Sequence, residues 1–119
     1  MIDIFHSKDE MFIQTGLQLH QWSHSKQDWI NSIKYGLLVE QPIKSYVKTK
    51  YNDTLALLFQ FLGQAFMEIG DISKAGEYLH QANELYLLAP GPDHPFYQHQ
   101  FLPLWQKFQD VFYQSSVKI

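Results

Sequence analysis

Residues 55–88, LALLFQFLGQAFMEIGDISKAGEYLHQANELYLL, decide the fold of this chain. Apolar side chains recur at helical spacing over 55–69 and again over 72–88, and Gly70-Asp71 separates the two runs. Gly70 supplies a turn, and Asp71 is placed to accept hydrogen bonds from the unpaired amides at the start of the second run. The stretch therefore predicts two helices that pack antiparallel around a short turn.

Small and large side chains within this pair follow the pattern of the tetratricopeptide repeat, a two-helix unit of 34 residues. Residues 56–89 supply the required residue type at eight positions, namely Phe59, Leu62, Gly63, Phe66, Gly70, Ala75, Leu79 and Ala82. The small residues allow the helices to cross closely, and the large ones fill the space beside the crossing. At Leu87 the repeat usually has a proline, and here the helix is expected to run on. The fold class is therefore all-α, with about five helices in antiparallel pairs of tetratricopeptide-like (TPR) superhelical architecture and one domain over 1–119.

A second, degenerate pair is expected on the N-terminal side, over residues 8–41. A first helix covers 8–23, and Asp28 caps a second that begins at Trp29 and ends at Pro42 or just before it. The positions of the repeat's second helix are taken by Trp29, Ser32, Tyr35, Gly36 and Val39, and its first helix matches only if roughly four residues are inserted in the turn around SHSK. Residues 43–53 are read either as an extension of this helix or as an irregular connection.

On the C-terminal side, LLAPGPDHP at 87–95 breaks the chain before a last helix at 95–114. Gly91 and Pro92 reverse the chain, Asp93 is expected to cap, and Pro95 to open the helix. Pro103 should kink this helix or mark its true start. Its rings, including Trp105 and Phe108, are expected to pack in the core rather than form a binding surface.

Histidines raise the alternative of a small metal-dependent enzyme that uses Asp93, His94 and His99. His94 and His99 are five residues apart, so a helix does not place them on one face. His20 and His24 are spaced i, i+4 but lack the acidic residue of a zinc motif, and surface positions are expected for both. No catalytic, cofactor or metal residue is therefore predicted. A self-associating structural module is the third alternative.

Composition narrows the function classes further. The net charge is −3 and all nine basic residues are lysines, which disfavours binding to nucleic acid. The chain has no cysteine, which excludes thiolate nucleophiles and cysteine zinc sites and fits a reducing compartment. No signal peptide or membrane-length apolar run is recognised, so an intracellular location in the cytoplasm, the nucleus or both is expected, without membrane contact.

The region resembles the C-terminal TPR-like domain of the SET-and-MYND (SMYD) family of protein lysine methyltransferases. The matching segments are WINSIKYG at 29–36, a connection with lysines and tyrosines at 43–51, and the two helices with GPDHP at 55–95. The resemblance implies a module that packs against a SET catalytic domain, walls its substrate cleft and binds protein partners such as a chaperone. It implies no activity here, because the chain lacks SET and MYND motifs; a longer parent protein could be a methyltransferase.

The expected function is therefore non-catalytic binding of protein or peptide segments, with no cofactor. Candidate groove residues on the helix at 55–69 are Leu57, Gln60, Gln64, Met67 and Glu68. None is basic, which disfavours a carboxylate clamp and favours apolar or amide-rich segments. Lys44, Lys48 and Lys50 form a candidate basic patch for an acidic partner, or else an ordinary solvated face.

Overall fold

The computed structural model describes residues 4–46 and 52–117, with side chains over 11–44 and 54–114. Its elements are α1 (Ile4–Ser25), α2 (Trp29–Tyr46), α3 (Asn52–Glu68), α4 (Ile72–Leu88), the π-helical turn η1 (Tyr97–Phe101) and α5 (Leu102–Val117). No strand occurs within these described ranges. The predicted all-α class is confirmed.

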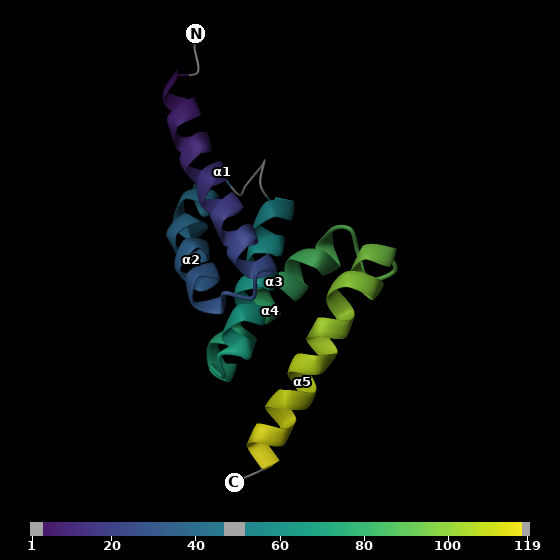
Figure 1. The fold of residues 1–119 in the computed structure, drawn as a ribbon. Helices are drawn as coiled ribbons and strands as arrows, with labels where there is room; N and C mark the ends of the chain where they lie inside the picture. The colour runs from purple at the N-terminus through teal and green to yellow at the C-terminus, as the bar shows by residue number, and fades with distance from the viewer. Residues whose placement is uncertain (1–3, 47–51, 118–119) are drawn as a thin grey trace.

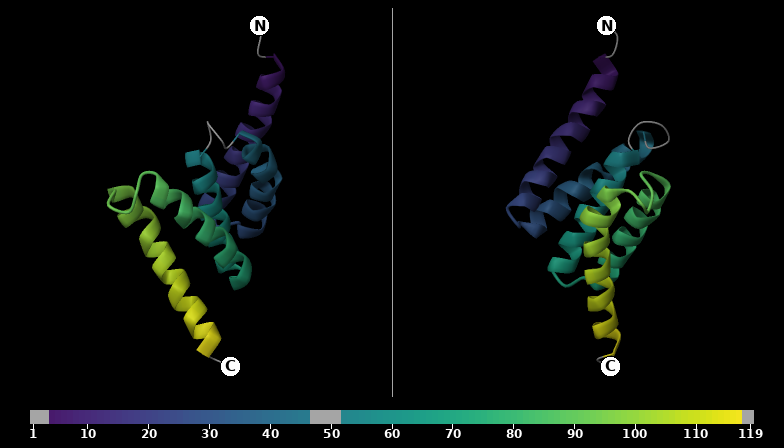
Figure 2. Two further views of the ribbon diagram at one scale, coloured as in Figure 1. Left: turned by 180° about the vertical axis from the view of Figure 1, so that it is seen from behind. Right: turned by 90° about the vertical axis from the view of Figure 1, so that its right-hand side faces the viewer.

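Successive helices pack against one another, α1 on α2, α2 on α3, α3 on α4, and α4 on α5 (Figure 1). The start of α1 and the end of α5 lie at opposite ends of the molecule (Figure 2). The principal extents of 58 × 32 × 21 Å describe an elongated body. A row of helices, rather than a closed bundle, therefore sets the surfaces available for binding.

The crossing of α3 and α4 forms the centre of the core. The six side chains of the repeat pattern there are all buried, namely Phe59, Leu62, Phe66, Ala75, Leu79 and Ala82. Gly63 lies so close to α4 that an added Cβ would stand 2.5 Å from Leu79 Cγ. Gly70 has φ +90°, a left-handed conformation that favours glycine, and the Asp71 carboxylate caps α4 by accepting from Lys74 N at 3.2 Å.

The second helix continues past the proline that was expected to end it. Asp28 Oδ1 accepts from Asn31 N at 3.4 Å at the start of α2, as predicted, but Pro42 lies inside the helix. A proline there costs a backbone hydrogen bond, yet Val39 and Ile43 on either side of it are completely buried. We attribute the continuation to this burial, which offsets the lost bond. Of the uncertain connection at 43–53, residues 43–46 are helical and 47–51 lie outside the described residues.

The turn after α4 reverses the chain as predicted, but a different residue caps the next helix. Gly91 has φ +105°, and helical structure begins at Pro95. The cap is His94, not Asp93: its Nδ1 accepts from Phe96 N at 3.0 Å and its carbonyl accepts from Gln98 N at 3.1 Å. A proline prefers the first helical position, so the residue directly before it is the one that caps.

Pro103 lies in the first turn of α5, directly after η1. Because Pro103 has no amide hydrogen and its ring crowds the carbonyl of residue 99, an ordinary α-helical turn is disfavoured there. The chain widens instead into the π-helical turn, in which Leu102 N bonds to Tyr97 O. The proline therefore marks the start of the regular α-helix, one of the two outcomes expected for it.

The rings of the last helix pack as a ladder against α4. Trp105 stacks between Phe101 and Phe108, with centroid distances of 6.2 and 5.7 Å. Phe101 and Phe108 are buried and Trp105 is half-buried, whereas Phe112 lies exposed further along α5. The rings of η1 and of the first half of α5 thus belong to the core, as expected.

Candidate functional site

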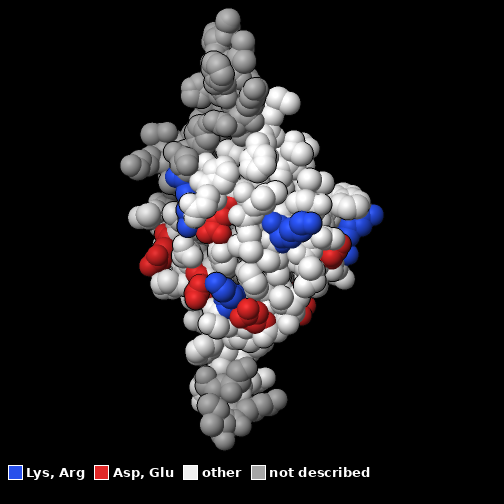
Figure 3. Space-filling model, turned by 90° about the vertical axis from the view of Figure 1, so that its left-hand side faces the viewer, with Lys and Arg blue, Asp and Glu red and all other residues white. Residues whose placement is uncertain are grey.

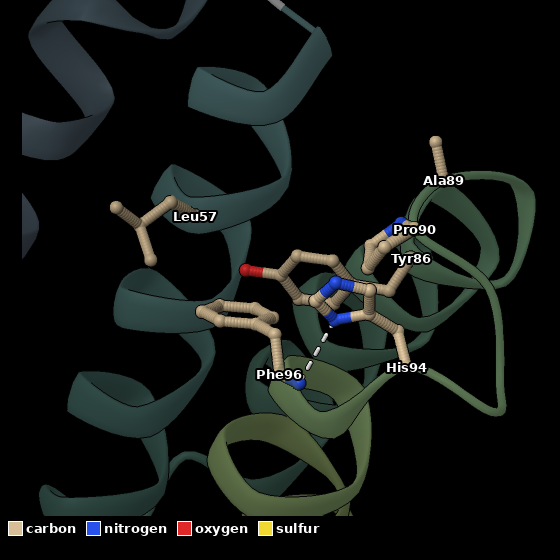
Figure 4. Close-up of a pocket in the computed structure, with 6 residues that line it drawn as sticks. All are labelled: Leu57, Tyr86, Ala89, Pro90, His94 and Phe96. Carbon is tan, nitrogen blue, oxygen red and sulfur yellow. Dashed lines mark hydrogen bonds between the residues drawn. The ribbon is translucent and has the colours of Figure 1, made fainter.

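Two hollows lie on either side of Leu57 on α3. The first, here called the turn hollow, has a volume of about 480 Å³ and lies between α3 and the α4–α5 connection (Figure 4). The second, here called the His20 hollow, has a volume of about 190 Å³ and lies between α1 and α3. Leu57 borders both, so one half-buried side chain separates two recesses that face successive helices.

Aromatic ring faces dominate the turn hollow. Tyr86 and Phe96 lie 5.3 Å apart between centroids, and Figure 4 shows them converging with the imidazole of His94 between α3 and the connection. The Tyr86 hydroxyl donates to Gln60 Oε1 at 2.7 Å, so its polar end is satisfied on α3. The remaining walls come from Leu57, Ala89 and Pro90. This recess is therefore suited to an apolar group.

His94 adds one polar group to the turn hollow. Its Nδ1 accepts the Phe96 amide hydrogen, the bond drawn as a dashed line in Figure 4. In the neutral ring the hydrogen is then on Nε2, because one imidazole nitrogen donates when the other accepts. The capping bond thus fixes both the ring's position and its tautomer.

His20 is the most deeply placed polar side chain of the second recess. It is 0 % exposed, and its Nδ1 donates to the carbonyl oxygen of Ser32 on α2 at 2.7 Å. Within the described part of the chain, its Nε2 has no hydrogen-bond partner. Burial lowers the pKa of His20 to about 4, outweighing the opposite effect of the Ser32 bond, so the ring is neutral near pH 7. His20 Nε2 is therefore a buried acceptor with its lone pair unused.

His24, one helical turn on, is held beside His20 by contacts to α3. Its Nε2 donates to Gln64 Oε1 at 3.0 Å, and its ring stacks on Phe61 with a centroid distance of 4.2 Å. Burial lowers the pKa of His24, against the opposing effect of the Gln64 hydrogen bond. The expectation of a surface position is wrong for His20, which is completely buried, whereas His24 is half-buried.

The five predicted groove residues on α3 divide between different surroundings. Leu57 lines both hollows, whereas Gln60 is buried against Tyr86 and Gln64 bonds to His24 on α1. Met67 is buried, and the exposed Glu68 lies 4.0 Å from Lys107 Nζ of α5. The structure therefore brings Leu57 alone of these five to the recesses.

The predicted basic patch is described only at Lys44. Lys44 Nζ lies 3.0 Å from Glu40 Oε2, and Glu40 Oε1 accepts from the Tyr78 hydroxyl at 2.8 Å. Burial, and next this hydrogen bond to Glu40, raise the pKa of Tyr78. Lys48 and Lys50 lie outside the described residues. On the α2 side of the molecule, basic and acidic side chains are interspersed among uncharged ones (Figure 3).

Metal ligands are not gathered in one place among the described side chains, over 11–44 and 54–114. No group of three or more histidine, aspartate or glutamate residues there is placed to hold an ion, and Asp93, His94 and His99 form no such group. None of the helices over the same ranges is long and apolar enough to cross a bilayer.

Sequence reasoning did not find the residues that form the recesses around Leu57. Tyr86 and Phe96 occur within apolar runs and carry no separate signal, and His20 is distinguished only by the carbonyl that another helix brings to it. For His94 a signal existed, since the position before a helix-opening proline is a capping position.

Comparison with protein-family models, with curated proteins and with solved structures finds no match to this chain. Its function is therefore inferred from its own geometry.

Proposed function

We propose that this chain is a non-catalytic TPR-like interaction module that binds an extended protein segment across α1, α3 and the α4–α5 connection. The observation that carries the proposal is the position of Leu57, which borders one recess toward α1 and another toward the α4–α5 connection. Helices α1 and α3 are the first helices of successive pairs, and stacked helix pairs create extended binding surfaces along such a row.

The sizes of the recesses favour a segment with two anchoring side chains. The turn hollow, at about 480 Å³, is within the range of small-molecule pockets, and the His20 hollow, at about 190 Å³, has room for one side chain. Full burial of an apolar side chain contributes roughly 1.5–3 kcal/mol, so two anchors supply roughly 3–6 kcal/mol before the entropic costs of association. Binding of this strength is weak and suits a transient partner.

The likeness to the C-terminal domain of SMYD methyltransferases is part of the proposal. It is supported by the repeat residues and by the buried α3–α4 crossing that they form. In a longer parent protein, the module would pack beside a SET domain and present its recesses to a substrate or a chaperone. The intracellular setting, in the cytoplasm or the nucleus, belongs to the same proposal.

A random-peptide display selection tests the binding function. Peptides selected on the wild-type protein should carry two apolar side chains and should lose binding to Leu57→Glu, which places a charge beside both recesses. Leu88→Glu is the matched control, because Leu88 is 83 % exposed and borders neither recess. Equal binding of the selected peptides to all three proteins would refute the proposal.

A second variant separates lost binding from lost folding. Ala89→Trp adds a ring at the exposed rim of the turn hollow without altering a buried residue. It should keep the far-UV circular dichroism of the wild type and weaken the same peptides. A folded Ala89→Trp protein that binds them with wild-type affinity would exclude the turn hollow as an anchor site.

Self-association is a second candidate function, favoured by one surface of α2. Ile30 and Leu37 lie seven residues apart on the same side of the helix, and both are exposed, as is Leu38. Sedimentation equilibrium at two concentrations should then reveal a dimer that Ile30→Glu abolishes. A monomer at both concentrations would remove this candidate.

A further inference from the structure

The His20 hollow combines apolar side chains, the uncharged polar side chains of Gln14, Gln21 and Thr54, and one buried acceptor that has no partner. Ile13, Leu17 and Leu58 line it with the ring of Phe61, and His20 Nε2 is the buried nitrogen left without a hydrogen bond within the described chain. Buried polar groups of folded proteins are almost always paired. An unpaired one beside a recess marks a position that a ligand group can complete.

We propose that the His20 hollow is a subsite for an aromatic side chain with a neutral hydrogen-bond donor, the hydroxyl of tyrosine or the indole N–H of tryptophan, which donates to His20 Nε2. The inference rests on the proposed function, because it names the chemistry of one anchor of the bound segment. It assigns the apolar anchor to the turn hollow and the donor-bearing anchor to the His20 hollow.

Contacts from α2 hold the imidazole in the orientation that the proposal requires. Ser32 O lies 2.7 Å from Nδ1, and a Cβ added at Gly36 would stand 3.0 Å from both Nδ1 and Cε1. The Nδ1 edge of the ring therefore faces α2 at close range. The other ring nitrogen, Nε2, lies beyond Cε1 from the Ser32 contact, and the ring centroid is 5.7 Å from that of Phe61, which lines the hollow. Because the Ser32 carbonyl fixes the hydrogen on Nδ1, Nε2 is held as an acceptor.

The surroundings select among donors. An ammonium group would have to leave water for a recess whose polar side chains, Gln14, Gln21 and Thr54, carry no counter-charge, which is unfavourable. A carboxylate offers no donor to the Nε2 lone pair. A ring with a polar tip buries its body against the aliphatic walls and Phe61, and its O–H or N–H satisfies the nitrogen.

Volume limits the occupant to one aromatic side chain. At about 190 Å³, the hollow is smaller than the roughly 300–1,000 Å³ of pockets for small molecules. Phenol, with seven non-hydrogen atoms, is of that size. Because an apolar ring of the same shape leaves the acceptor unpaired, the donor should be preferred by roughly 10- to 100-fold.

Phenol and toluene form a matched pair of probes, since they differ in the hydroxyl that would reach His20. Each is titrated into the ¹⁵N-labelled full chain while long-range ¹H–¹⁵N spectra follow the ring nitrogens of His20 and His24. Phenol should shift the unprotonated Nε2 of His20 and bind at least about tenfold more tightly than toluene. Equal affinities for phenol and toluene, or no change in the ¹⁵N chemical shift of His20 Nε2 up to the solubility limit of phenol, would overturn the proposal.

Two variants localise the effect. His20→Phe removes the acceptor and should abolish the preference for phenol over toluene. Thr54→Trp keeps His20 but fills the hollow from α3, and it should abolish the phenol-induced shift; the second variant serves if the first does not fold. A phenol preference that survives in a folded Thr54→Trp protein would place the site elsewhere and overturn the proposal.

The outcomes also separate this subsite from the function on which it rests. If Leu57-dependent peptides are selected but contain no tyrosine or tryptophan at a fixed position, and phenol binds no better than toluene, the subsite is refuted and the interaction module stands. If phenol binds at His20 while no peptide depends on Leu57, the subsite stands as a small-molecule site and the interaction function is refuted.

Discussion

Replacing Gly63 with alanine should destabilise the protein, although alanine is the better helix former. The new Cβ would stand 2.5 Å from Leu79 Cγ, 2.6 Å from Leu79 Cδ2 and 3.2 Å from Leu79 N. A branch carbon and a backbone nitrogen cannot move aside alone, so α4 must shift from α3. Contacts of 2.5 and 2.6 Å place the overpacking cost near the top of its usual range, at about 3 kcal/mol, and the better helix propensity returns about 1 kcal/mol, so we expect a net loss of about 2 kcal/mol.

Urea unfolding followed by circular dichroism measures this loss. With a denaturant slope of about 2 kcal/mol per molar, the midpoint should fall by about 1 M. Gly76→Ala is the matched control, since its Cβ meets only the far edge of the Phe108 ring, with Cζ at 2.9 Å, and that side chain can shift. It should stay within about 0.5 kcal/mol of the wild type. A Gly63→Ala protein as stable as Gly76→Ala would refute the close crossing of α3 and α4.

Three further predictions concern polar groups. The pKa of His20 is about 4 in the folded chain and 6.5 in the unfolded chain. The neutral ring's contribution to folding stability is therefore fully present above pH 6.5 and is lost as the pH falls to 4. The free energy of unfolding, obtained from urea titrations at each pH, should fall by about 3 kcal/mol over this range. A free energy that does not change with pH would contradict the prediction. Asp71→Ala removes the cap on Lys74 N and should cost about 1 kcal/mol of unfolding free energy, whereas Asp71→Asn should retain most of it. Tyr86→Phe removes the donor to Gln60 Oε1 and should cost about 1–2 kcal/mol in the same assay, and unchanged stability would show that this bond contributes nothing.

Helices α3 and α4 could be predicted because their signals are local. Apolar spacing, the Gly70 turn and the Asp71 cap all act within a few residues along the chain. The prediction that α2 ends at Pro42 is wrong, because proline's local effect on a helix takes no account of the burial of Val39 and Ile43. That burial depends on packing against other helices.

The recesses could not be predicted, since each requires elements distant in sequence to meet. The burial of His20 depends on the Ser32 carbonyl twelve residues away and on Phe61 of α3. Gln60 and Gln64 look equivalent in the sequence, being four residues apart on one helix. They differ in the structure because Gln60 meets Tyr86 of α4 and Gln64 meets His24 of α1.

The elongated row of helices has a hydrodynamic consequence. A compact domain of 119 residues has a radius of gyration of about 13.5 Å, whereas the value for this molecule is 15.2 Å. A monomer of these proportions meets more friction than a sphere of equal mass and diffuses more slowly. It will therefore elute from a gel-filtration column ahead of globular standards of its mass. Early elution is thus the behaviour of the single chain, and sedimentation equilibrium, which depends on mass and not on shape, is the measurement that distinguishes it from a dimer.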